Sequence, residues 1–120
     1  MKNFFAAILP DQGTYFITSI KAKVCRNHPC HSFDEMVHKV DELDIQGYDT
    51  FFACASYQQE SYIGDDGKSH QRTGDNAGWV KSFFLDIDCG PDKASKGKGY
   101  INIEEALAAA IGANIPVHEP

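Results

Sequence analysis

The sequence of 120 residues has no excess of positive charge, and this limits the partners that it can have. There are 11 Lys and Arg residues against 17 Asp and Glu residues, which gives a net charge of −6. A protein that coats nucleic acid regardless of sequence normally carries a basic balance, so this class of function is disfavoured. A polymerase remains compatible with the charge, because bound metal ions supply much of the positive charge at such a site.

The chain also lacks a long apolar run. No stretch approaches the roughly 18 apolar residues of a membrane-spanning helix, and the first ten residues carry one Lys and too short an apolar run for a signal peptide. We therefore expect a cytoplasmic protein without a membrane partner. In that compartment the four cysteines should be free thiols. They are Cys25, Cys30, Cys54 and Cys89.

Cysteine pairs of the Cys-x-x-Cys type, which are typical of structural zinc sites, are missing too. The nearest pattern is Cys25-x-x-His28-x-Cys30-His31, in which two of the possible ligands are adjacent. Pro29 stiffens the middle of this pattern, and Ser32 directly after it starts a helix. The spacing therefore does not favour zinc.

The apolar pattern that is present predicts alternating strands and helices, without internal repeats. A half-exposed strand is expected over 15–24, with Pro29 closing the connection after it, and an inner strand over 48–55. Helices are expected after the capping signals Ser32 and Asn102, ending at Gly47 and Gly112. Polar loops should span 58–78 and 89–100. The order predicts an α/β (α+β) fold, a small mixed sheet with flanking helices.

The most informative segment is Lys-Ser-Phe-Phe-Leu-Asp-Ile-Asp-Cys-Gly at 81–90, which is expected to be a strand. Side chains alternate along a strand, so Asp86 and Asp88 should share one face, with Cα atoms about 6.5 to 7 Å apart. Two carboxylates on that spacing can bind one divalent cation, or two cations about 3.5 to 4 Å apart. The alternative is a strand end that runs into solvent, with Asp88 capping a turn.

Basic residues near these acids are candidates for phosphate contact. Lys93, Lys96 and Lys98 lie in a loop with two glycines directly after Asp88. Ammonium groups and backbone amides suit phosphate, although such a loop is equally well explained as a solvated turn. Arg72 can match a phosphate bidentately, or be a surface residue. Trp79 and Tyr57 can stack on bases, but packing is the favoured role.

With these residues in view, the chain resembles the archaeo-eukaryotic primase superfamily, in particular the primase-polymerases of phages and plasmids. The apolar strand that ends in Asp-x-Asp corresponds to the first catalytic motif of that family. Flanking segments are also similar over roughly residues 14–116. They are Phe51-Phe52-Ala53-Cys54-Ala55-Ser56-Tyr57, Arg72-Thr73-x-x-Asn76 and Lys81-Ser82-Phe83-Phe84.

The resemblance implies template-directed nucleotidyl transfer in DNA replication. Asp86 and Asp88 would be the catalytic, metal-binding residues for Mg²⁺ or Mn²⁺, and Lys81, Arg72 and the loop lysines would contact nucleotide or phosphate. The implied partners are nucleoside triphosphates and a single-stranded DNA template, with a helicase domain or protein as a further candidate, in a host cytoplasm if the protein is phage-encoded.

The second motif of the family, Ser-x-His, and its third metal-binding acid are absent from the sequence. We therefore expect an N-terminal portion of a catalytic domain, with an α/β part with a long loop over about 1–78 and the start of the metal-binding half over 79–120. The segment 113–120 looks like the approach to a further strand.

Two other functions remain open. A haloacid-dehalogenase-like phosphatase also begins from Asp-x-Asp, although Cys89-Gly90 after the motif and its place in mid-chain count against it. The other is a non-catalytic domain that binds nucleic acid or protein.

Overall fold

The computed structural model describes residues 1–116. They form two compact units, Met1–Phe83 and a second unit that starts at Phe84, and each is described by itself. The sequence placed the division after residue 78. No helix within 1–116 combines the length and apolar character needed to cross a membrane.

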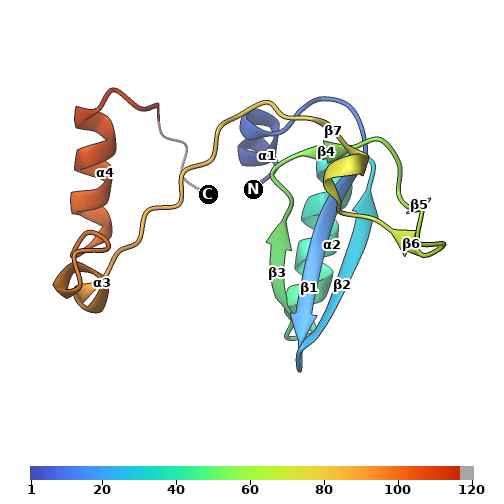
Figure 1. Cartoon of the computed structure of the whole chain (residues 1–120), viewed down its shortest axis with the longest axis horizontal. Coiled ribbons are helices and arrows are strands. Elements are labelled where there is room, and N and C mark those ends of the chain that lie inside the picture. Colours follow the sequence, from blue (N-terminus) through green and yellow to red (C-terminus); the bar gives the residue numbers. More distant parts are fainter. Residues whose placement is uncertain (117–120) are drawn as a thin grey trace. The chain divides into compact units, whose positions relative to one another are not determined.

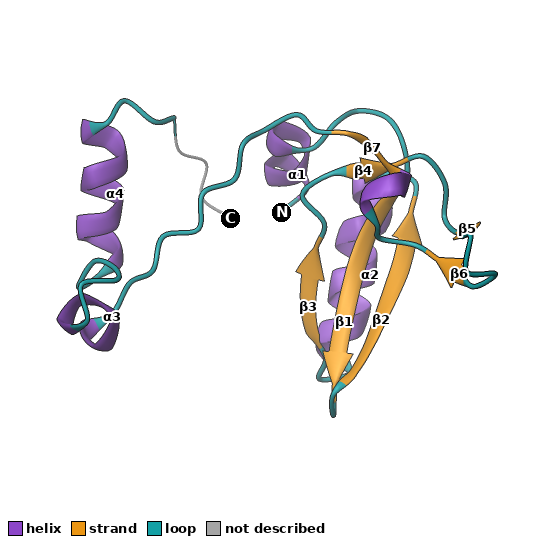
Figure 2. Cartoon of the chain, in the orientation of Figure 1, coloured by secondary structure: helices purple, strands orange, loops and turns teal. Residues whose placement is uncertain are grey.

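The first unit is built on a three-stranded antiparallel sheet with one helix packed along it (Figures 1 and 2). Its elements are α1 (Lys2–Ile8), β1 (Tyr15–Lys21), β2 (Val24–Cys30), α2 (Phe33–Ile45) and β3 (Asp49–Phe52). The strand order is β2-β1-β3. Helices and antiparallel strands occur together, so the predicted α+β class is confirmed, although the named sheets are antiparallel rather than mixed.

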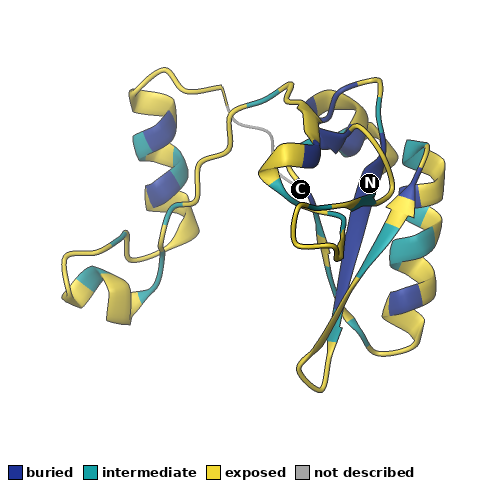
Figure 3. Ribbon diagram, turned by 45° about the vertical axis from the view of Figure 1, so that its right-hand side comes forward, coloured by how far each residue is buried: buried dark blue, intermediate teal, exposed yellow. Residues whose placement is uncertain are grey.

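The central strand is β1, and two expectations about the strands were wrong. β1 was predicted to be half-exposed, yet it is the most buried strand of the three-stranded sheet, with Phe16 and Ile17 both fully inaccessible (Figure 3). The segment 48–55 was predicted as an inner strand, but β3 pairs only with β1 among the described residues. Burial therefore follows the position of a strand in the sheet more than its own pattern of residues.

The sequence predicts a single strand over 15–24 and does not predict β2. The chain instead turns at Ala22 and Lys23, whose φ angles are 50° and 67°. Pro29 lies within β2 rather than closing a connection after β1. Proline is tolerated there because β2 is at the edge of the sheet, where one side of the strand needs no N–H donor.

Helix α2 begins and ends as predicted. The Ser32 hydroxyl accepts a hydrogen bond from the Glu35 backbone N–H at 3.1 Å. Gly47 follows the helix with a φ of 78°, a conformation that favours glycine. The buried face of α2 contributes Met36 and Leu43 to a core with Tyr15 and Ile17 of β1. This core fixes which face of the sheet is covered.

The predicted loop 58–78 contains short regular elements. They are β5 (Tyr62–Ile63), β6 (Ser69–His70), the 3₁₀ helix η1 (Gly74–Asn76) and the start of β7 (Ala77–Trp79). β7 pairs with β4 (Ser56–Tyr57), and β5 pairs with β6. The polar sequence of this region therefore folds back on itself as hairpins instead of remaining irregular.

The second unit contains α3 (Pro91–Ser95) and α4 (Ile103–Gly112). The Asn102 side chain caps α4 as predicted, accepting from the Glu105 N–H at 2.9 Å, but Gly112 is the last residue of α4 rather than its stop signal. The predicted strand over 81–90 does not form in the described chain, where only Cys89 makes an isolated bridge, to Tyr100. A strand is held by its neighbours, and no described strand runs beside this segment. The end of the predicted segment 113–120 lies outside the described residues.

Candidate functional site

The two candidate metal-binding acids are both exposed. The carboxylate of Asp86 makes no hydrogen bond or ion pair with any residue in 1–116. Asp88 Oδ2 lies 3.4 Å from Lys93 Nζ, with both side chains about half exposed. An exposed pair at that distance contributes little to stability, so it leaves the Asp88 carboxylate accessible to other cations.

The loop after these acids is closed by backbone hydrogen bonds. Tyr100 N–H donates to the Asp88 carbonyl at 2.9 Å, and Gly90 N–H donates to the Tyr100 carbonyl at 2.8 Å. A Cβ on Gly99 would lie 2.2 Å from the Asp88 carbonyl oxygen, so the close approach of the two loop ends requires glycine there. The closure keeps Lys93 and its neighbours beside Asp88.

The lysines of this loop differ in their contacts. Lys93 lies in α3 and makes the ion pair with Asp88. Lys96 and Lys98 are exposed, and neither side chain forms an ion pair within the described part of the chain. Within the second unit the ion pair therefore joins Asp88 to Lys93, while Lys96 and Lys98 follow α3 without a side-chain contact to Asp88.

The other two predicted phosphate-binding residues belong to the first unit. Lys81 Nζ donates to the Ala6 carbonyl at 2.7 Å, at the C-terminal end of α1. This contact gives Lys81 a structural role, because a cation is favourable at the carbonyl end of a helix. Arg72 instead lies over the sheet, where its guanidinium donates to the Thr18 hydroxyl.

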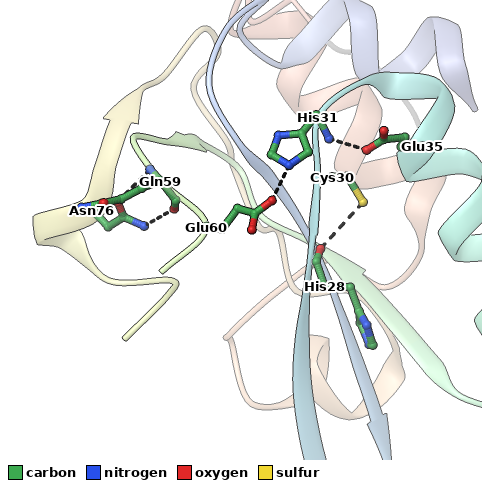
Figure 4. A network of polar contacts seen from close by, with 7 residues as sticks. All are labelled: His28, Cys30, His31, Glu35, Gln59, Glu60 and Asn76. Atoms are coloured by element: carbon green, nitrogen blue, oxygen red, sulfur yellow. Dashed lines mark hydrogen bonds and ion pairs between the residues drawn. The ribbon is translucent and has the colours of Figure 1, made fainter. Parts of the chain in front are cut away.

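Asn76 holds the backbone next to Arg72 through Gln71, and it also binds the backbone of Gln59 (Figure 4). Its side chain is almost fully buried and makes three hydrogen bonds with the backbone. Nδ2 donates to the carbonyls of Gln59 and Gln71, both at 2.8 Å, and Oδ1 accepts from the Gln59 N–H at 3.1 Å. Because Gln71 precedes Arg72, this clamp fixes the point from which the guanidinium extends.

A second contact in Figure 4 ties the same region to the start of α2. His31 Nε2 and Glu60 Oε1 lie 2.5 Å apart, and the His31 N–H donates to Glu35 Oε2 at 2.6 Å. His31 is thus engaged by carboxylates. Cys30 is buried, and burial raises the pKa of its thiol to about 11.

No three His, Cys, Asp or Glu side chains gather as a metal-binding group within residues 1–116. All four cysteines are unpaired, as predicted. Tyr57 is buried edge-on against Phe16, with ring centroids 5.1 Å apart, so it packs in the core instead of standing free to stack on bases.

Sequence reasoning missed the partners of Arg72. Thr18 is a buried polar residue in the central strand, and its hydroxyl also donates to Asn27 Oδ1 at 2.7 Å. A threonine inside a buried strand carries little signal, because its methyl group suits such a strand as well as its hydroxyl does.

Comparison with known proteins identifies no relative. No family model, no curated protein and no solved structure matches the chain.

Proposed function

We propose that this chain is part of a DNA primase/polymerase and supplies its Asp-x-Asp motif for template-directed nucleotidyl transfer. The main support is the sequence Asp86-x-Asp88 directly before a lysine-rich loop, whose ends are hydrogen-bonded together and whose Lys93 pairs with Asp88. Carboxylates suit hard divalent cations, and lysines suit the phosphates of a nucleoside triphosphate. Both kinds of group are needed in one place for this reaction.

The two acids fit Mg²⁺ or Mn²⁺ in their chemistry. They offer exposed carboxylate oxygens, and one competing cation, Lys93, lies at the long distance of 3.4 Å from Asp88. When bound, such ions activate the attacking 3′-hydroxyl and stabilise the charge of the leaving pyrophosphate. Two carboxylates alone leave most of an octahedral shell to water, so we expect weak metal binding by this chain.

The lysines would hold the triphosphate next to the acids. Lys93 is already oriented toward Asp88, and Lys96 and Lys98 extend from the turn after α3. Ammonium groups attract phosphate as point charges and need no fixed geometry, so mobility of these side chains does not prevent the role. Orientation of the triphosphate would still require groups beyond these lysines.

The parent protein would complete this half-site. It would supply the Ser-x-His motif and the third acid, and it would act in the cytoplasm on a single-stranded DNA template, alone or with a helicase.

The test is metal-dependent nucleotide incorporation on a primed single-stranded template by a longer polypeptide that contains the whole chain. Asp86→Asn and Asp88→Asn should each lower the rate by several orders of magnitude, since the ions act mainly on charge that develops in the transition state. Asp92→Asn, an exposed acid of the same loop, is the matched control and should retain activity. Full activity of either Asn variant would refute the proposed role of these acids.

The 120-residue chain itself should be inactive in the same assay, and calorimetry should show weak Mn²⁺ binding that the double variant Asp86→Asn/Asp88→Asn removes. Metal binding that is equal in the double variant would contradict the site. A generic phosphoester assay addresses the dehalogenase-like alternative, for which Asp86 would be required for hydrolysis without a template.

A non-catalytic binding function is the second candidate, and the exposed apolar side chains around the motif favour it. Phe83 is fully exposed and Leu85 is 63% exposed. Exposed apolar side chains that are close in sequence are typical of surfaces that another chain covers. Such a module would bind its partner unchanged when both acids are replaced, and it would show no incorporation in any longer polypeptide.

A further inference from the structure

The face of the three-stranded sheet opposite α2 is partly covered: Phe16 is buried against Tyr57 and Thr18 is buried, whereas Phe51 is 53% exposed. Ile17 contributes to the core with α2, so its neighbour Thr18 projects from the opposite face of β1. In the register of the sheet, Thr18 lies between Asn27 of β2 and Phe51 of β3. Residues that pair directly across antiparallel strands share a face. Asn27, Thr18 and Phe51 therefore form one row across the face opposite α2.

Arg72 is placed above this row by two independent contacts. Its guanidinium donates to the Thr18 hydroxyl, which in turn donates to Asn27 Oδ1 at 2.7 Å. The backbone before Arg72 is held by the Asn76 side chain through the Gln71 carbonyl. An arginine that is fixed at both ends loses less conformational freedom when a ligand binds, which favours affinity.

The charge of Arg72 has no acidic partner in the described part of the chain. The guanidinium carries five N–H donors, and the Thr18 hydroxyl takes one of them. The remaining donors match a phosphate group bidentately. The positive charge of Arg72 also acts on Cys54: burial raises the pKa of the Cys54 thiol, and the Arg72 charge opposes that rise.

Phe51 adds an aromatic surface to the same row. Its side chain is 53% exposed, although it lies directly opposite a threonine that is buried. Exposed aromatic rings on a sheet stack on nucleic-acid bases irrespective of sequence, because every base has a π face. One row further along, Ile20 pairs with Asp49, and that acid disfavours a second phosphate at its end of the sheet.

We infer that the exposed surface formed by Arg72 and Phe51 on this face of the sheet binds a single-stranded nucleic acid, with one phosphate on Arg72 and an adjacent base stacked on Phe51. The unpaired cation in the same row as an exposed aromatic ring favours this occupant over an apolar peptide, which would bury the guanidinium without an anion. The inference deepens the proposed function and depends on it for the role of the bound strand as the template.

The test measures binding of the whole 120-residue chain to a labelled oligothymidylate of roughly 12 nucleotides by fluorescence anisotropy, with EDTA present and KCl varied. Arg72→Gln should raise Kd by about tenfold or more and reduce the salt slope by about 0.7, the value for one phosphate contact on a single strand. Phe51→Leu should raise Kd about fivefold or more and leave the slope unchanged.

Two comparisons make these changes specific. Arg26→Gln removes an exposed arginine from the α2 side of the same sheet, where Arg26 pairs with Ser19, and should change Kd less than about twofold. Phe51→Trp keeps a stacking surface and should retain affinity. Circular dichroism and the thermal midpoint of each variant show whether it is folded.

Several results would overturn the inference. They are the absence of oligonucleotide binding by the folded wild type, unchanged binding by folded Arg72→Gln or Phe51→Leu, and an equal loss in Arg26→Gln. A dimer that these variants disrupt, with oligonucleotide binding unaffected, would identify the face as a contact between copies and would also overturn it.

Failure of the proposed function gives a different result. The double variant Asp86→Asn/Asp88→Asn should bind the oligonucleotide normally in EDTA. If binding follows Arg72 and Phe51 while no longer polypeptide incorporates nucleotides, the proposed function is wrong and the binding face remains. If incorporation depends on the acids but binding ignores Arg72 and Phe51, only the binding face is wrong.

Discussion

Replacement of Asn76 is the sharpest test of how the loop over the sheet is held. Asn76→Ala removes three hydrogen bonds to the backbone of Gln59 and Gln71. At about 1 kcal/mol net for each, with some recovery from water at the exposed end of the loop, the free energy of unfolding should fall by about 2 to 4 kcal/mol. Because Asn76 is 2% exposed, part of this cost is the loss of packing.

The nearly isosteric variant Asn76→Asp separates hydrogen bonding from packing. A carboxylate can still accept the hydrogen bond from the Gln59 N–H. Its second oxygen, however, replaces Nδ2 and lies next to the two carbonyl oxygens to which Nδ2 donates in the wild type. At neutral pH this variant should be at least as unstable as Asn76→Ala. The folded state should raise the pKa of the new acid, so its stability relative to wild type should increase as the pH falls from 7 toward its unfolded pKa of about 4.

Urea unfolding of the full chain provides the assay. Trp79 is the single tryptophan, and it lies in β7 directly after the loop, so its fluorescence reports this region. Asn3→Ala, an exposed position in α1, is the matched control and should change stability by less than about 0.5 kcal/mol. A folded Asn76→Ala variant within that limit of wild type, or a stable Asn76→Asp variant at pH 7, would refute the clamp.

Two further predictions concern packing and thiol burial. Gly13→Ala should lower the unfolding free energy by about 2 to 5 kcal/mol in the same urea assay, since φ is +94° and a Cβ would lie 2.8 Å from the indole ring. Gly67→Ala, with φ +73° and no atom within 4 Å, should cost only about 1 to 2 kcal/mol, and equal costs would contradict this argument. Cys30, whose pKa burial raises to about 11, should react with a thiol reagent at pH 8 only after unfolding, whereas exposed Cys25 should react at once. Mass spectrometry of pulse-labelled protein distinguishes them, and equal labelling of both in the native state would show that Cys30 is accessible.

Local signals in the sequence were sufficient for the helices. Ser32 and Asn102 each precede an acidic residue three positions later and an apolar stripe at helical spacing, and both side chains cap as predicted. Strand β2 could not be found in the same way, because its sequence contains Pro29 and is largely polar. β2 is stabilised by pairing with β1 along its whole length, so its formation depends on the neighbouring strand and not on its own sequence pattern.

The residues of the candidate site differ in the same way: some have a local signal in the sequence, and others depend on distant neighbours. The acids and the loop lysines are consecutive in the sequence, so a motif finds them. The contact between Arg72 and Thr18 joins positions 54 residues apart, and it depends on a register and a loop clamp that no local pattern contains. Spacing along a strand could not show that the central strand carries a polar group on the face opposite α2.

In the segment around Asp86, the proposed metal site depends on the strand that the sequence predicts and that the described chain does not form. Alternation puts two carboxylates on one face only when a neighbouring strand fixes the backbone, and the described chain offers no such neighbour. Pairing would also bury Leu85, now 63% exposed, on the other face, which is worth about 1.5 to 3 kcal/mol at full burial. A bound cation would offset the repulsion between the acids on the first face. Strand pairing and metal binding should therefore stabilise each other, because each lowers the cost of the arrangement that the other requires.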